Sequence, residues 1–525
     1  MRLKKKILRD LTYIILIATL FGCGNIGREN EDYRTSEKEK KEDTIAIPIN
    51  NDMNGVNRDF SDSIDSLLAT NIVYSPLYTY EKGNIKNYLA KDVKFVDDKI
   101  MTITLREELK WHDNVPIEAE DIIFTINTIL DEKQKSPLRK YFIIDGQPIK
   151  TELKDNLTFQ VILPTKVPSF LYEMSNVIPI PKHIYEGKGN ILEYSKNNNP
   201  IGSGPFKLKE WKKGESITFT RFEEYFADKA KVDNIVLKVI PKKEDMERAL
   251  ENGEITLMRG SLNQFQKAKT LENIQTFTYN GGRLNYIMFN ENIDYMRNKD
   301  FRKAISYGLN RKEIIKSAYN DEISNEAKSI LIPQADFYTE DIEDYEHNLS
   351  RAKEFMEKSK MKVKALKLGY NTERFAHKEY ALAIQGQLRV LNIDVDIIPY
   401  DNNSFYKELF KNDKECDMYI TGYNLGLSPN DYRYIYETGS IYNTSGYSNT
   451  EIDKLWDEGF KELNDEKRKN IYEKIQKLIA DDAAIYTIDY EENLMIAKKS
   501  LRGLDEAIRS EGIVMFKDWS KLYIE

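Results

Sequence analysis

The chain has 525 residues, of which 78 are basic and 86 are acidic, so its formal net charge at pH 7 is −8. The two signs are interspersed, which excludes the basic stripe that marks a nucleic-acid-binding surface. Beyond the first 23 residues no apolar run is long enough to cross a membrane, and the roughly 480 residues of the folded part are too many for one hydrophobic core, so we expect two to four domains.

The N-terminus has the pattern of a secretory signal. Basic residues between positions 2 and 9 precede an apolar run over residues 11–21, which is shorter than the roughly 20 residues that a membrane span needs. Gly22 and Cys23, at the end of this run, resemble the lipobox of bacterial lipoproteins. The resemblance implies cleavage before Cys23 and lipidation of its thiol. The alternative is an ordinary signal in which Cys23 has no role.

Residues 24–44 are almost devoid of apolar side chains and carry a dense block of charges at 37–43. Such a segment cannot bury enough apolar surface to offset its chain entropy. We therefore expect residues 1–22 to be a lipoprotein signal peptide and residues 23–44 to be a disordered tether.

The residue types that build metal and catalytic sites are scarce or badly placed. The four histidines show no paired spacing: His112, His183, His347 and His377. We therefore expect no metal site and no cofactor. Ser203 lies between two glycines, but Pro205 would obstruct the helix that follows a nucleophilic serine. Cys416 lies in an apolar stretch, where a buried and inert thiol is the better interpretation. The sequence predicts no enzyme.

The first two informative segments of the folded part read as strands with a turn or a helix beside them. Residues 105–113 predict a strand and a turn, and residues 119–126 predict a helix with one apolar face. The first half of residues 200–211 contains Gly202 and Gly204, which permit unusual backbone conformations. From Phe206 the segment alternates between apolar and polar residues, which predicts a strand.

Two further segments follow. Residues 286–290 predict a strand and residues 301–311 a helix, after which Asn310 caps the next helix. Residues 421–432 with 446–455 form the last segment. In this order the four segments resemble the signature phrases of the extracellular solute-binding proteins of peptide and nickel ABC transporters, solute-binding family 5. The chain is identified as a member of that family, closest to its oligopeptide-binding members.

The resemblance implies a fold class and a domain organisation. The fold is expected to be α/β, a two-lobed periplasmic-binding-protein-like fold (class II, cluster C) with an extra inserted α/β domain. Three domains follow: lobe I over 45–73, 198–283 and 498–525, the inserted domain II over 74–197, and lobe III over 284–497. Two crossing strands are expected near residues 286–290 and 486–490.

The resemblance also implies a function. The chain is expected to be a lipid-anchored substrate-binding component of an ABC importer, a monomer at the outer face of the cytoplasmic membrane that delivers oligopeptides to permease and ATPase subunits. Its membrane contact would be the lipid anchor only, and nucleic acid would not be a partner. Main-chain hydrogen bonds of the strand-addition kind would hold the peptide. The residues expected to contact it are Asn54, Gly55, Val56, Tyr423, Asn424 and Leu425. For Tyr423 the alternative is a core aromatic, and for Gly55 an ordinary turn glycine.

One segment departs from the family pattern. Ser428 and Asn430 replace its two aspartates, and Asp431 lies one position further along. In peptide binders of this family an aspartate in this loop pairs with the ligand's α-ammonium group. Asp431 is the nearest replacement, and the alternative is that it caps the turn before Tyr432. A non-peptide solute, such as a sugar, an opine or a metallophore complex, and a receptor role for a peptide signal stay open.

Overall fold

The computed structural model describes residues 42–53, 55–57, 64–81, 83–320, 322, 325–508 and 515–525. The signal peptide, Cys23 and Asn54 lie outside these residues. Thr44, which we placed at the end of the tether, is the first residue of β1 and pairs with Asn234. Within the described ranges, no helix combines the length and the apolar character that crossing a membrane requires.

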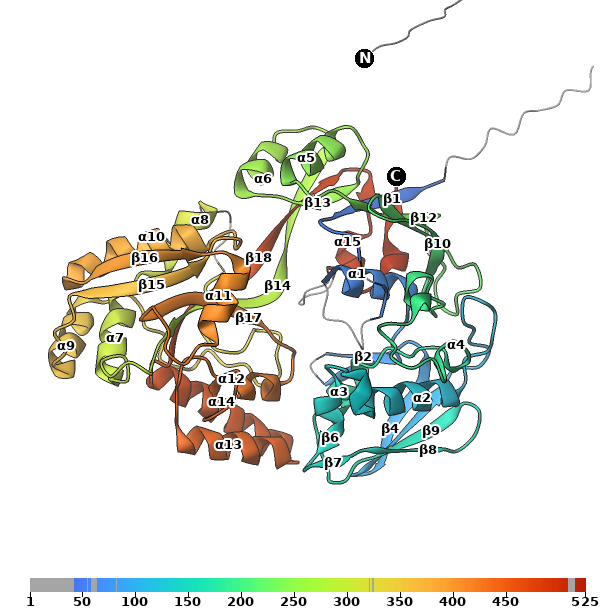
Figure 1. The fold of residues 1–525 in the computed structure, drawn as a ribbon, viewed down its shortest axis with the longest axis horizontal. Coiled ribbons are helices and arrows are strands. Elements are labelled where there is room, and N and C mark those ends of the chain that lie inside the picture. The colour runs from blue at the N-terminus through green and yellow to red at the C-terminus, as the bar shows by residue number, and fades with distance from the viewer. Residues whose placement is uncertain are drawn as a thin grey trace, which may run out of the picture. The chain divides into compact units, whose positions relative to one another are not determined.

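The first sheet of the described chain has four strands in the order β1-β12-β11-β10 (Figure 1). Their bounds are Thr44–Ile49 (β1), Phe206–Lys212 (β10), Ser216–Arg221 (β11) and Asn234–Val239 (β12). β1 and β12 are parallel, and the other pairs are antiparallel. β10 begins at Phe206, as the alternating pattern predicts, and α1 (Ile64–Val73) lies against it.

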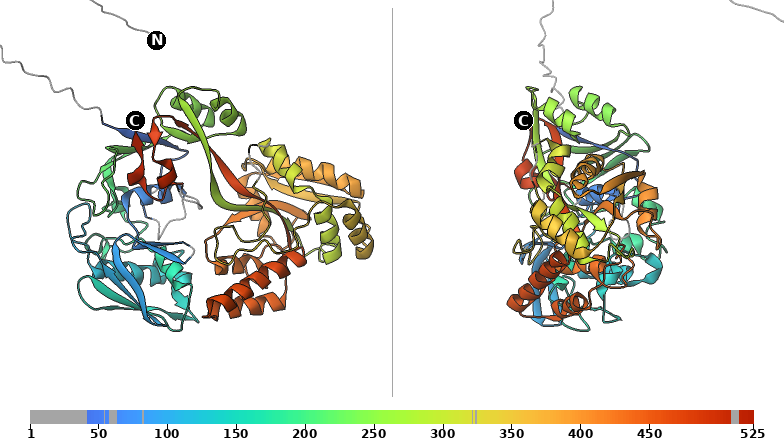
Figure 2. Two further views of the ribbon diagram at one scale, coloured as in Figure 1. Left: turned by 180° about the vertical axis from the view of Figure 1, so that it is seen from behind. Right: turned by 90° about the vertical axis from the view of Figure 1, so that its left-hand side faces the viewer.

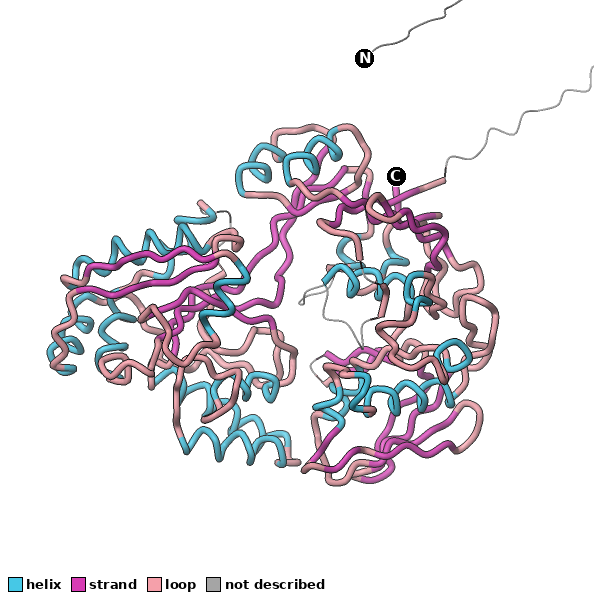
Figure 3. Tube along the Cα trace, viewed as in Figure 1, coloured by secondary structure: helices cyan, strands magenta, loops and turns pink. Residues whose placement is uncertain are grey.

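A second sheet, also of four described strands, is antiparallel throughout and has the order β4-β5-β9-β8. Its strands are among the magenta segments at the lower right of Figure 3. Its bounds are Ala90–Asp97 (β4), Ile100–Leu105 (β5), Lys150–Leu153 (β8) and Thr158–Ile162 (β9). The helices and short strands around it are β2 (Tyr78–Glu81), β3 (Asn84–Asn87), α2 (Ala119–Leu130), η2 (Glu132–Gln134), η3 (Arg139–Phe142), β6 (Ile143–Ile144), β7 (Gln147–Pro148), α3 (Phe170–Ser175), α4 (Lys182–Tyr185) and η4 (Ser195–Asn198). The predicted helix over 119–126 is α2, which packs on β8 and β9.

The large sheet has the order β13-β18-β14-β17-β15-β16 in the described chain. Its bounds are Leu257–Arg259 (β13), Ile274–Phe289 (β14), Ala365–Asn371 (β15), Asp394–Tyr400 (β16), Met418–Asn424 (β17) and Ile485–Lys498 (β18). β14 and β18 are long antiparallel neighbours, and the left view of Figure 2 shows them side by side. The strands that we expected near residues 286–290 and 486–490 overlap β14 and lie in β18, and their crossing role stays a prediction. The domain boundaries themselves stay predictions.

Helices flank the large sheet. The last elements of the chain lie near the first sheet. The remaining elements are α5 (Lys243–Glu251), α6 (Leu262–Ala268), α7 (Lys299–Gly308), α8 (Arg311–Tyr319), α9 (Leu349–Ser359), α10 (His377–Leu388), η5 (Arg389–Leu391), α11 (Asn402–Leu409), η6 (Pro429–Tyr432), α12 (Arg433–Tyr436), α13 (Thr450–Lys461), α14 (Asp465–Asp481), β19 (Leu501–Arg502), α15 (Leu504–Ala507), η7 (Trp519–Lys521) and β20 (Tyr523–Ile524). Asn310 caps α8 as predicted, since its side chain accepts the N–H of Glu313.

The large sheet is buried on both faces. Along β14, Ile287 and Phe289 belong to one hydrophobic cluster, while Tyr286 and Met288 belong to another. Successive side chains of a strand point to opposite faces, so the two clusters cover the two sides of the sheet. Strands buried in this way read as continuous apolar runs, which is the pattern of this stretch of sequence.

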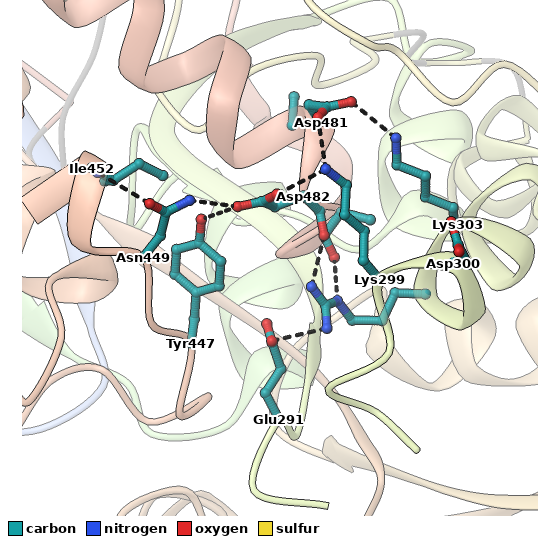
Figure 4. A network of polar contacts seen from close by, with 12 residues as sticks. Glu291, Lys299, Asp300, Lys303, Tyr447, Asn449, Ile452, Asp481 and Asp482 are labelled. Atoms are coloured by element: carbon teal, nitrogen blue, oxygen red, sulfur yellow. Dashed lines mark hydrogen bonds and ion pairs between the residues drawn. The ribbon is translucent and has the colours of Figure 1, made fainter. Parts of the chain in front are cut away.

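A buried network of polar contacts ties α7 to the end of α14 (Figure 4). The Arg302 guanidinium is 3% exposed, lies 2.9 Å from the Glu291 carboxylate and donates to the main-chain oxygen of Asp482. The Asp482 carboxylate accepts hydrogen bonds from Tyr447 and Asn449. The third and fourth sequence segments therefore meet in the folded chain and hold one another.

The loop before β10 is clamped between the end of α1 and His112. The N–H of Gly202 donates to Nδ1 of His112 over 3.2 Å, so Nε2 carries the proton and donates to the carbonyl of Gly204 over 3.0 Å. Burial lowers the pKa of His112 to about 4, which keeps the ring neutral. A Cβ atom on Gly202 would lie 2.0 Å from the carbonyl oxygen of Val73. Ser203 is buried here and accepts a main-chain N–H, which is a structural role.

Candidate functional site

A cavity of about 620 Å³ opens between segments that are far apart in the sequence. Its walls come from residues 67–88 around the β2-β3 hairpin, from 138–178, from 424–431 after β17, and from 516–519. This volume lies within the roughly 300–1,000 Å³ that is usual for ligand sites. In the described part of the chain, no group of three or more His, Cys, Asp or Glu residues is arranged to hold a metal ion.

One wall of the cavity continues from the end of β17. This strand pairs with β14 as far as Asn424, but it pairs with β15 only from Met418 to Ile420. Residues 421–424 therefore extend beyond β15. Asn424 and the next residue, Leu425, line the cavity. The side chain of Asn424 is held by a hydrogen bond to the carbonyl of Gly281 on β14.

The loop after β17 is shaped by a close approach from α3. The N–H of Leu427 donates to the hydroxyl of Tyr172 over 3.0 Å. A Cβ atom at Gly426 would lie 1.9 Å from that hydroxyl and 2.1 Å from Oδ2 of Asp431. Only a residue without a side chain leaves room for both groups, so Gly426 sets the position of the loop against α3.

Two buried carboxylates face the cavity. Asp431 on η6 is 8% exposed and Glu173 on α3 is 6% exposed, and both line it. Burial raises the pKa of Asp431 to about 7, opposed by Lys140 and by hydrogen bonds from Tyr141 and Tyr172. Burial, and then the neighbouring Asp431, raise the pKa of Glu173 well above its ordinary value.

Lys140 lies beside this pair among aromatic rings. Its Nζ atom is 4.8 Å from the ring centre of Tyr141, 5.2 Å from that of Tyr434 and 5.9 Å from that of Tyr442. A cation above aromatic rings is attracted by their electron-rich faces. Because Lys140 and Tyr141 belong to η3 whereas Tyr434 belongs to α12, this contact joins the two sides of the cavity.

The structure separates the residues that we expected to contact a ligand. Asn424, Leu425 and Asp431 line the cavity. Tyr423 lies in the core on one face of the large sheet, where its hydroxyl donates to the carbonyl of Ile330, and this is the alternative that we kept open for it. The described Gly55 and Val56 lie elsewhere.

Gly55 and Val56 pack against η4. The N–H of Val56 donates to the carbonyl of Asn197, and a Cβ atom at Gly55 would lie 2.8 Å from Cβ of Asn197. Gly55 also has a φ of +99°, which an L side chain rarely adopts. Neither residue lines the cavity, so their part in binding stays a prediction. Cys416 is fully buried, and burial raises the pKa of its thiol to about 11.

Sequence reasoning missed three cavity residues of η3 and α3, and Lys140 beside them. Lys140, Tyr141, Tyr172 and Glu173 belong to neither the four segments nor the predicted contact set. One signal was present, because Glu173 is the charged residue of a short helix, Phe170–Ser175, that is otherwise uncharged. A buried acidic side chain needs a hydrogen-bond or charge partner, so this residue could have been recognised as a candidate site residue.

Comparisons with known proteins agree with this architecture. The model of "Bacterial extracellular solute-binding proteins, family 5 Middle" matches residues 84–445. The oligopeptide-binding protein AppA of Bacillus subtilis is 25% identical over 466 residues, which are 82% of this chain and 83% of AppA. The dipeptide-binding protein DppE of the same organism is 25% identical over 437 residues, which are 78% of this chain and 79% of DppE.

Solved structures match over nearly the whole described chain. A proposed peptide-binding protein, AppA from Clostridium difficile, is 52% identical with a TM-score of 0.87, and the match covers 92% of this chain and 100% of that one. The ABC transporter substrate-binding protein CtaP from Listeria monocytogenes is 35% identical with a TM-score of 0.89 and the same coverage. These matches confirm the predicted α/β, two-lobed binding-protein fold.

Proposed function

Because this chain belongs to the bacterial extracellular solute-binding proteins, family 5, which are transport binding proteins and not enzymes, we propose that it captures oligopeptides for an ABC importer. It would work as a monomer anchored by a lipid at the outer face of the cytoplasmic membrane. The bound peptide would be passed to permease and ATPase subunits.

One observation carries the peptide assignment. Residues 421–424 of β17 extend beyond β15, and the chain then continues along the cavity wall at Leu425. A strand edge that borders a ligand cavity suits a peptide, because an extended peptide adds to the edge through main-chain hydrogen bonds. Main-chain recognition does not depend on the ligand's side chains, so the proposal includes a broad sequence preference.

The proposed contacts follow from this geometry. Asn424 and Leu425 would supply main-chain donors and acceptors, and Asp431 would meet the ligand's α-ammonium group. Gly55 and Val56 would take part only after a change in their loop, since the N–H of Val56 is already bonded to Asn197. Tyr423 would act from behind the strand, by holding β17 in place through its buried hydroxyl.

Calorimetry with peptide pools tests the ligand class. The full chain, purified in detergent, is titrated with mixed pools of di- to nonapeptides. We expect a pool to bind more tightly than about 100 μM, which corresponds to roughly 5.5 kcal/mol. If none does, the peptide assignment is wrong, and mass spectrometry of small molecules that copurify with the protein then identifies the solute class.

We also propose that Cys23 carries the lipid. The support is its place directly after the apolar run of the signal. Two acyl chains on one cysteine give the stable attachment that a single chain does not. Cys23→Ala should abolish metabolic labelling by a palmitate analogue, while Cys416→Ala, which removes a buried thiol, should leave the labelling unchanged. Labelling that persists in the Cys23 variant would contradict the anchor.

A further inference from the structure

Glu173 is a buried acid that has no hydrogen-bond partner in the described part of the chain. It is 6% exposed and lines the cavity, and among the described residues its carboxylate makes no hydrogen bond and no ion pair. A buried carboxylate that lacks partners costs several kcal/mol if it is ionised. The described elements around Glu173 provide no hydrogen bond or ion pair to its carboxylate, and its position at the cavity wall leaves it available to a ligand.

The charges that face this carboxylate do not balance when both acids are ionised. The titratable groups around Glu173 and Asp431, from the described elements packed against them, are Lys140, Tyr141, Tyr172, Tyr432, Tyr434 and, on α14, Tyr472, whose pKa burial also raises. Burial raises the pKa of each of these tyrosines, so all of them stay neutral. Lys140 is then the one cation in this set, against two carboxylates.

We propose that Glu173 is a second recognition carboxylate, which binds a ligand ammonium group together with Asp431. When no ammonium group is bound, the two acids share one proton, and the ammonium group replaces that proton on binding. The inference rests on the proposed function, because it takes the α-ammonium group of a peptide as the cation. It adds a specificity-determining residue on α3, the helix whose Tyr172 bonds to the loop before η6.

The exchange follows from charge balance. Without a ligand cation, the pair retains a proton at neutral pH, because desolvation and the neighbouring carboxylate both disfavour a second negative charge. When the ligand's ammonium group lies between the acids, the site has two cations, Lys140 and the ammonium group, and two carboxylates. The shared carboxylic proton then passes to solvent, and the O–H bond of the acid is replaced by N–H hydrogen bonds from the ligand.

Two consequences can be measured. Binding releases a proton, so affinity for a free-amine ligand rises with pH through the range in which the pair would otherwise hold that proton. The ligand is selected by its cation, so a peptide whose amino group is acetylated gains nothing from Glu173. A purely structural role for Glu173 would produce neither effect.

The test compares Glu173→Gln with the wild-type chain, both as full-length protein. The glutamine has the same shape as a protonated glutamate, so we expect the variant to fold, as checked by thermal unfolding. Calorimetry uses a pool of di- to nonapeptides with free amino groups and the same pool after N-acetylation. Phosphate and imidazole buffers at pH 7, which have different heats of ionisation, report the number of protons released. Glu193→Gln, on an exposed position outside the cavity, is the matched control.

We expect Glu173→Gln to weaken binding of the free-amine pool by about tenfold or more, which is roughly 1.4 kcal/mol. Binding of the acetylated pool should change little, and proton release should fall to less than half of the wild-type value. An unchanged affinity for the free-amine pool, or equal losses for both pools, overturns the proposal and leaves the peptide assignment intact. If the wild-type chain binds neither pool, the proposed function fails first and this inference fails with it.

Discussion

At residue 431 the structure shows the surroundings of one aspartate, whose part in binding stays a prediction. Ser428 is the N-cap residue of η6 but makes no side-chain cap hydrogen bond, and Asp431 lines the cavity. Its hydrogen bonds come from the hydroxyls of Tyr141 and Tyr172, and Lys140 acts on it through space. The site therefore has hydrogen-bond donors and one nearby cation, but it also has a second acid that needs a cation of its own.

We predict that Asp431→Asn weakens a free-amine peptide by about 2 kcal/mol or more and barely affects its N-acetylated form, because one partner of an enclosed charge pair is removed. Competition binding with both forms of one peptide measures the difference. Equal losses for the two forms, or no loss for either, would remove Asp431 from the ammonium site and favour N-blocked or non-peptide ligands.

At the scale of elements, the loop before β10 resembles a nucleophilic serine motif in sequence, but its role in the structure is to connect other elements. His112, at the end of the first segment, bonds to both glycines of the second. The carbonyl of Val73, the last residue of α1, fills the space where a side chain of Gly202 would lie. The loop connects α1 to β10 and so positions the chain near the cavity.

Gly202→Ala should lower the free energy of unfolding by about 2 kcal/mol or more, because the added methyl group forces main-chain atoms apart. Urea unfolding of the full chain, followed by tryptophan fluorescence, measures the change. Gly386→Ala is the matched control: this helical glycine has open space around its Cβ position, so alanine should raise the free energy of unfolding by about 0.5–1 kcal/mol. Equal stability of the Gly202 variant and the wild type would refute the clamp.

At the scale of the whole described unit, the cavity is bounded by contacts between segments that are distant in the sequence. Tyr172 on α3 bonds to Leu427 after β17, and Lys140 on η3 faces Tyr434 on α12. In the large sheet, β18 and β14 lie next to each other, with β13 on one side and β17 on the other. A ligand in the cavity would therefore contact segments that lie far apart in the sequence.

We predict that the protein becomes more compact when it binds a peptide, because a ligand that touches both sides of the cavity favours the conformation in which they are close. Small-angle scattering should show a smaller radius of gyration with the peptide pool than without it. Tyr172→Phe, which removes the hydroxyl bonded to Leu427, should reduce this change. A radius that is the same with and without bound peptide would contradict closure.

The sequence alone determined the elements whose causes are local. The strand from Phe206, the helix α2 and the Asn310 cap of α8 follow from side-chain periodicity and capping over a few residues. It also singled out Asp431, because a departure from a known phrase is visible without coordinates. The apolar run before Cys23 is local in the same sense, and its lipid anchor stays a prediction.

Tertiary structure alone decided which side chains share the cavity. Tyr423 and Leu425 are two positions apart, yet the first belongs to the core and the second to the cavity wall, because the strand ends between them. Glu173 and Asp431 line the same cavity because α3 packs against the loop after β17, which no local pattern encodes. Burial then sets their pKa values, and burial depends on every element that surrounds them.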